Sequence, residues 1–145
     1  MEWWQGVQTA AAIVGSAGVV VATLVFRQTR EQARTTFEDS INQEYRRIFS
    51  ILPPEVFLAD GRVELSPEQE RAVLSYFDLS NEQLRLINEG RVAEGTARMW
   101  RQGIQELMAL ATFEDQWKMW NGGLPATFFT QLSECMATGE PRRPS

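Results

Sequence analysis

The chain of 145 residues contains no histidine and only one cysteine, Cys135. Without histidine, the commonest general base, most zinc sites and every nucleophile that depends on an imidazole are excluded. A single cysteine rules out a disulfide within the chain, which fits a reducing compartment such as the cytoplasm. The sequence therefore predicts no cofactor and no metal, and leaves carboxylates and apolar surfaces as the groups of interest.

Glycine and proline are also missing from one long stretch, because neither occurs between Val19 and Leu52. These two residues weaken or end helices, so a helix is predicted to continue through this stretch until Pro53 and Pro54 stop it. No long segment alternates with period two, and no tight turn joins two β-rich runs. The expected fold class is all-α.

Charge is absent from a long stretch near the beginning of the chain, since residues 3–26 contain no Asp, Glu, Lys or Arg. A helix needs about 20 mostly apolar residues to cross a bilayer. A cleaved signal peptide would instead carry its positive charge before the apolar core. Residues 1–26 are therefore predicted to form a transmembrane anchor that contacts membrane lipid.

The orientation of the predicted anchor follows from three arginines that come after it, Arg27, Arg30 and Arg34. Positive charge gathers on the cytoplasmic side of a span. The sequence thus predicts an inner (cell) membrane protein with its N-terminus outside and its C-terminal domain in the cytoplasm.

Small residues recur at helical spacing within the predicted anchor: Ala11, Gly15, Gly18 and Ala22. Such a stripe lets two helices approach closely in lipid. We expect it to be an oligomerisation face of a homo-oligomer. The alternative is that alanine and glycine are simply common in membrane spans.

The rest of the chain divides by composition. Residues 27–36 have almost no apolar side chain and are interpreted as a stalk. Residues 37–139 are predicted to form a cytosolic helical domain, a compact bundle of about four helices, followed by a flexible tail over 140–145. The net charge of −5 argues against nucleic acid as a partner, because nucleic-acid-binding surfaces are usually basic.

Helices of the domain are marked by local signals. One is an apolar stripe at helical spacing, formed by Phe37, Ile41, Tyr45, Ile48 and Leu52. Ser66 and Pro67 predict the start of a helix, with Gln69 completing a capping box, and Gly90 predicts its end.

Later helices are marked less clearly. Gly103 falls inside a helix predicted near residues 93–110, where it costs about 1 kcal/mol relative to alanine. This cost suggests the close approach of a neighbouring helix. Thr112 and Asp115 predict a second capping box, and a last helix is expected from about Leu124.

Polar and apolar residues crowd together between Tyr76 and Gln83. Two carboxylates one turn apart, Asp78 and Glu82, can face each other, but acid–base work would need burial to separate their pKa values. The structural interpretation is a buried ion pair across the bundle, and the functional one is a polar recognition notch between helices. The residues of this candidate cluster are Arg46, Arg47, Asp78, Asn81 and Glu82.

Five short segments also carry a resemblance: Phe37–Ser40, Glu44–Arg47, Tyr76–Gln83, Gly90–Val92 and Trp100-x-x-Gly103-Ile104. From about Phe37 to Trp120, the chain resembles a bacterial family of short proteins with one N-terminal span, classed as a domain of unknown function. The resemblance implies an inner-membrane protein with a cytosolic helical domain. It implies no activity and no catalytic residue.

Three functions follow from these patterns. The first is a membrane-anchored cytoplasmic helical interaction module, non-enzymatic, that binds itself or a protein partner. The second is a homo-oligomeric membrane effector that perturbs the bilayer, although the span has few polar residues to line a pore. The third is a hydrolytic enzyme that uses the carboxylates of Asp78 and Glu82.

Overall fold

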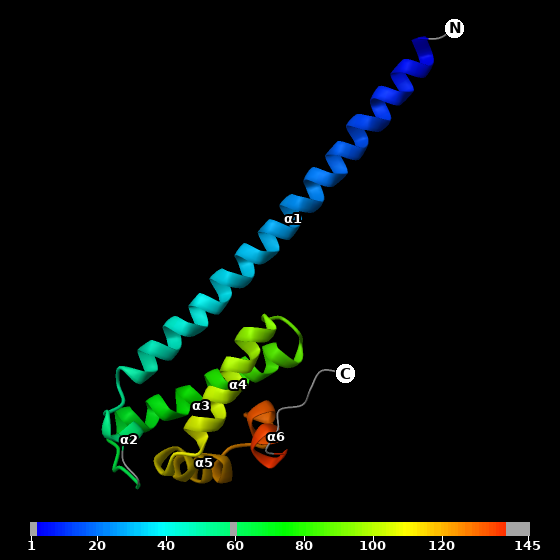
Figure 1. Cartoon of the computed structure of the whole chain (residues 1–145). Helices are drawn as coiled ribbons and strands as arrows, with labels where there is room; N and C mark the ends of the chain where they lie inside the picture. Colours follow the sequence, from blue (N-terminus) through cyan, green and yellow to red (C-terminus); the bar gives the residue numbers. More distant parts are fainter. Residues whose placement is uncertain (1–2, 59–60, 139–145) are drawn as a thin grey trace. The chain divides into compact units, whose positions relative to one another are not determined.

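The computed structural model describes the backbone of residues 3–58 and 61–138, and the side chains of residues 25–58 and 61–138. Within this part of the chain there are six helices and no strand (Figure 1). The helices are α1 (Trp3–Phe49), α2 (Glu55–Leu58), α3 (Pro67–Asn88), α4 (Glu94–Met108), α5 (Ala111–Gly123) and α6 (Thr130–Thr138). The predicted all-α class is confirmed.

The chain divides into two units, residues 1–37 and residues 38–145. The second unit is a helical bundle made of the last turns of α1 together with α2 to α6. Its central element is α3, which packs against α4, α5 and α6 (Figure 1). Both cavities discussed below lie in this unit and share α3 as a wall.

The predicted transmembrane helix over residues 1–26 has to be corrected. In the part of the chain that the structure describes, no helix is both long enough and apolar enough to cross a membrane. Described side chains begin at Val25, and charged residues recur from Arg27 onward, so this part of α1 lacks a run of about 20 apolar residues. The side chains of the predicted oligomerisation face lie outside the described residues: Ala11, Gly15, Gly18 and Ala22.

The apolar stripe near the end of α1 packs into the bundle. Ile41, Ile48 and Leu52 are buried, and Tyr45 is half-buried. The helix ends at Phe49, three residues before the predicted end, and residues 50–52 form a turn that leads to the two prolines. Burial of each such aliphatic side chain stabilises the bundle by roughly 1.5–3 kcal/mol.

Aromatic rings form the centre of the bundle. Tyr76 and Phe77, adjacent residues of α3, are at most 1% exposed, and Phe113 of α5 is fully buried. The ring of Phe113 lies 5.3 Å from that of Tyr76, edge to face, and the ring of Trp117 lies 5.3 Å from that of Phe77. Edge-to-face pairs contribute about 0.5–1.5 kcal/mol each beyond the burial of their area.

The start of α3 follows the predicted capping box. The backbone N–H of Gln69 donates to the hydroxyl oxygen of Ser66 at 3.3 Å, and the backbone N–H of Ser66 donates to Oε1 of Gln69 at 2.9 Å. Pro67 occupies the first turn, where its missing N–H needs no partner. Local sequence alone is enough to begin this helix.

The end of α3 is also as predicted. Gly90 follows the helix with a φ of +68°, a left-handed conformation that costs other residues energy. Its N–H donates to the carbonyl of Ile87 at 3.0 Å, and the N–H of Arg91 donates to the carbonyl of Leu86 at 2.9 Å. These two bonds are the Schellman motif, which satisfies the last carbonyls of the helix.

The start of α4 depends on a residue far away in the sequence. Ala93 precedes the helix and has no side chain that can cap it. Glu38 of α1 takes this role, since its Oε1 accepts from the N–H of Ala93 at 3.3 Å and its Oε2 accepts from the hydroxyl of Thr96 at 3.0 Å. A carboxylate at this end of a helix is also favoured by the helix dipole.

The predicted capping box of Thr112 and Asp115 does not form. The residue before α5 is Leu110, and no side chain caps the helix there. The hydroxyl oxygen of Thr112 instead accepts from the N–H of Val63 at 3.0 Å, and Asp115 pairs with Arg62. Both side chains therefore hold the loop before α3. Helix signals in the sequence do not reveal that this loop is their partner.

Two glycine substitutions test this description of the helices in opposite directions. Gly90→Ala is expected to lower the free energy of unfolding by about 1–2 kcal/mol, because alanine is strained at this φ. Gly103→Ala is expected to raise it by up to about 1 kcal/mol, because alanine favours the helix and a Cβ there meets no atom within 4 Å. Denaturant unfolding of the full chain measures both; a loss of stability in Gly103→Ala would contradict the open space beside that residue.

Candidate functional site

The residues of the predicted polar cluster do not join across the bundle as ion pairs. Both nitrogen–oxygen contacts of Arg47 go to Glu44 on the same helix, at 2.6 and 2.9 Å. Glu82 likewise accepts from Arg85, at 2.5 and 2.9 Å. Residues one turn apart reach each other without help from the tertiary fold, and Arg46 remains exposed.

The two carboxylates considered for catalysis lie in settings that do not suit an acid–base pair. Hydrogen bonds from Arg85 hold the pKa of Glu82 below its usual range, which keeps this carboxylate ionised. Asp78 is exposed. Because a general acid needs a raised pKa, this geometry favours a structural role for Glu82.

Asn81, the remaining polar residue of the segment, caps another helix. Its Oδ1 accepts from the backbone N–H groups of Gln131 and Leu132 at 2.9 and 3.1 Å. These are the unpaired donors at the start of α6. The side chain of Asn88 adds a second link, donating to Oε1 of Gln131 at 2.5 Å.

Asp78 lines a groove of about 460 Å³ along α3. Apolar side chains form most of its surface: Leu74, Leu79, Leu124, Phe128 and Phe129. Glu44, Ser75 and Asp78 are its polar residues. We call this surface the α3 groove. Phe128 is 57% exposed, whereas the neighbouring Phe129 is buried.

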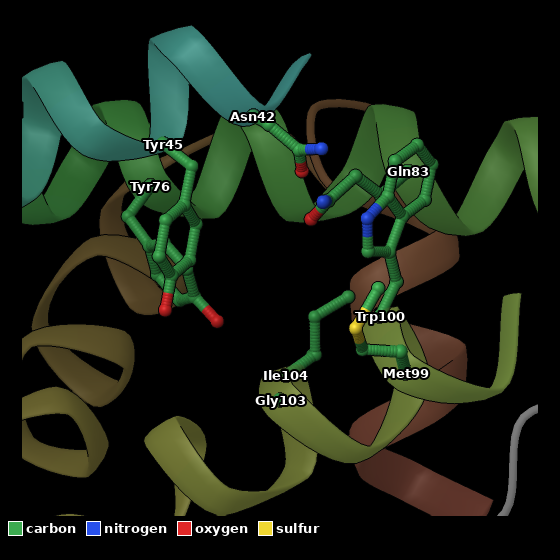
Figure 2. A pocket seen from close by; sticks show the side chains of 8 residues that line it. All are labelled: Asn42, Tyr45, Tyr76, Gln83, Met99, Trp100, Gly103 and Ile104. Atoms are coloured by element: carbon green, nitrogen blue, oxygen red, sulfur yellow. The ribbon is translucent and has the colours of Figure 1, made fainter. Parts of the chain in front are cut away.

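A second cavity, of about 230 Å³, lies between α3, α4 and the last turns of α1 (Figure 2). We call it the Tyr–Trp pocket. Six of its lining residues are Asn42 and Tyr45 from α1, Tyr76 and Gln83 from α3, and Trp100 and Ile104 from α4. Met99 and Gly103 complete the lining, and none of the eight is charged.

The sequence patterns mark the segments that form the Tyr–Trp pocket but point to other residues within them. Between Tyr76 and Gln83 the predicted residues are Asp78, Asn81 and Glu82, whereas the two end residues of this segment face the pocket. The sequence signal that marks the pocket residues is a side chain with a polar atom on the apolar face of a helix. Gly103 was expected to allow close helix packing, and it faces open space instead.

Metal and thiol chemistry find little support in the described residues. Within the described ranges, no three Cys, Asp or Glu side chains gather closely enough to hold a metal ion. Cys135 is buried, and burial raises the pKa of its thiol although Arg101 opposes the shift. The thiol therefore stays protonated and is a poor nucleophile at neutral pH.

No protein-family model, curated protein or solved structure matches this chain. The resemblance to a bacterial single-span family therefore stays a prediction, and the two cavities are the features of the described residues that indicate a function.

The capping role of Asn81 gives a prediction for α6. Asn81→Ala is expected to lower the free energy of unfolding by about 0.5–2 kcal/mol, because two N–H groups lose their acceptor. Amide exchange at Gln131 and Leu132 should become faster. Asn88→Ala is the matched control: it removes only an exposed side-chain contact and should cost less than about 0.5 kcal/mol. Equal exchange in the two variants would contradict the capping role.

Proposed function

We propose that residues 38–138 form a non-enzymatic interaction module that binds a protein partner through the α3 groove. The observation that carries the proposal is Phe128, a large aromatic side chain left 57% exposed beside a groove with an apolar surface. Contiguous exposed apolar surface is typical of interaction sites. Aromatic residues in such places often contribute most of the binding energy.

The charges beside the groove indicate the chemistry of the partner. Glu44 and Asp78 line it together with the apolar residues, and the whole chain carries a net charge of −5. Glu44 shares its carboxylate with Arg47, so Asp78 is the acidic group that we expect to meet the partner. The best fit is a short segment with a bulky apolar residue flanked by lysine or arginine.

A second copy of the chain fits this groove less well. Symmetric dimers place the same surface of each copy in contact, so the acidic residues of one groove would face those of the other. Like charges brought together across an interface disfavour binding. A different protein with basic residues avoids this repulsion.

The proposal predicts selective binding of basic apolar peptides. Two synthetic peptides share the same leucine and phenylalanine residues and carry either lysine or glutamate at both flanks, and fluorescence anisotropy measures their binding to the full chain. We expect binding of the lysine peptide. Phe128→Ser should weaken it about 10-fold or more, because an apolar contact is lost. Asp78→Lys should weaken it a few-fold and reduce its dependence on salt.

Matched controls use changes of the same kind outside the groove. Met119→Ser removes an apolar side chain that is 50% exposed on α5, and Glu106→Lys reverses an exposed charge on α4. Both should bind the lysine peptide as the wild type does. Equal binding of the glutamate peptide, or no binding of the lysine peptide, would overturn the proposal. A wild-type dimer that Phe128→Ser dissociates in sedimentation would do so too, since a second copy would then cover the groove.

A further inference from the structure

The Tyr–Trp pocket is separate from the α3 groove, and no residue lines both. In Figure 2 the amide groups of Asn42 and Gln83 gather with the indole nitrogen of Trp100 at one end of the pocket. The rings of Tyr45 and Tyr76 lie at the other end, with their centroids 6.2 Å apart. The pocket thus has hydrogen-bonding groups at both ends and apolar surface between them.

Two of these groups are buried donors without a partner. The indole N–H of Trp100 and the hydroxyl of Tyr76 make no hydrogen bond among the described residues. Trp100 is 6% exposed and Tyr76 is 1% exposed. A buried donor that lacks an acceptor costs about 1–3 kcal/mol, and buried groups of this kind usually have a partner.

The two groups differ in the hydrogen bonds that they can make. Indole nitrogen is a donor only, whereas a phenol both donates and accepts. Burial raises the pKa of Tyr76 well above its usual value, and the nearby Ser80 hydroxyl only partly opposes this shift. The phenol therefore keeps its proton and has the Ser80 hydroxyl close by, so the indole N–H of Trp100 is the donor that calls for an acceptor oxygen or nitrogen on a ligand in the pocket.

The size and charge of the pocket narrow the ligand further. A cavity of about 150 Å³ holds benzene, and drug-sized ligands occupy about 300–1,000 Å³. At about 230 Å³ the pocket falls between these, a volume that suits one or two fused rings. Because its lining carries no charge, a charged molecule would lose its hydration without gaining an ion pair.

Two residues of α4 keep the pocket open and accessible. At Gly103 a Cβ would meet no atom within 4 Å, so the missing side chain leaves room for a ligand. Met99 is 62% exposed. A methionine side chain is flexible and polarisable, and it adapts to ligands of different shape.

We propose that the Tyr–Trp pocket binds a neutral, planar molecule of one or two fused rings that carries a hydrogen-bond-accepting oxygen. The ring lies between the aromatic and aliphatic side chains of the lining. The oxygen accepts from the indole N–H of Trp100, and a second acceptor, where the molecule has one, meets the phenol of Tyr76.

The test uses coumarin, which has two fused rings and a carbonyl oxygen but no donor, and naphthalene, which has the rings alone. Nitrogen–proton correlation NMR of the full chain resolves the tryptophan indole signals, and Trp100→Phe assigns that of Trp100. Coumarin should move this signal, as a new hydrogen bond does. Naphthalene should bind about 2- to 10-fold more weakly, because it offers no acceptor.

Two variants place the ligand. Gly103→Leu fills the space beside α4 and should weaken coumarin about 10-fold or more. Trp100→Phe keeps a ring but removes the donor, and should weaken coumarin about 2- to 10-fold while leaving naphthalene unchanged. Gly95→Leu is the matched control: it makes the same change in the same helix at an exposed position outside the pocket.

The wild-type signal is measured without any variant, so the proposal stays testable if Gly103→Leu does not fold. An unmoved Trp100 signal at saturating coumarin would overturn the proposal. Equal affinity of the wild type and a folded Gly103→Leu would overturn it as well. So would tighter binding of a coumarin carboxylate than of coumarin, because the pocket offers a negative charge no partner.

Discussion

The burial of Tyr76 and Phe77 against Phe113 is the interaction on which the rest of the bundle depends. Adjacent residues of a helix point about 100° apart, so these two rings serve different sides of α3. Tyr76 meets the aromatic rings at the end of α1, and Phe77 meets Trp117 of α5 and Phe129 before α6. One helix turn therefore links elements that the sequence keeps far apart, and α3 becomes a wall of both cavities.

Polar contacts then set the position of the elements around each cavity. Asn81 binds the start of α6, and Phe128 of the groove lies two residues before that helix. Glu38 binds the start of α4, and Tyr45 of the pocket lies two turns further along the same helix as Glu38. Each cavity thus depends on one helix capped by a side chain from another, and loss of a cap is expected to change the cavity as well as the stability of the fold.

The candidate sites could be predicted only as segments. The crowded stretch that begins at Tyr76 does line both cavities, but its residues have other roles than those inferred from their charge. Glu82 pairs locally with Arg85, because a neighbour one turn away is always within reach, whereas a pair across the bundle requires the fold to bring both side chains together. The groove depends on Phe128, which the sequence pattern assigned to the apolar stripe of a helix predicted from about Leu124. That prediction is wrong at this point, because α6 begins only at Thr130 and Phe128 is left exposed in the turn before it.

The sequence by itself determined the all-α class and both ends of α3, because each depends on residues within a few positions of one another. It placed the end of α1 at the prolines, three residues too late, because a turn over residues 50–52 comes first. Only the tertiary structure decided that Thr112 and Asp115 hold a loop instead of capping their own helix, and that Gly103 opens a pocket instead of admitting a neighbour. Hydrogen bonds within a helix turn follow from chain geometry. Contacts across the bundle depend on which helices pack together, and the packing of the helices is determined by the whole core.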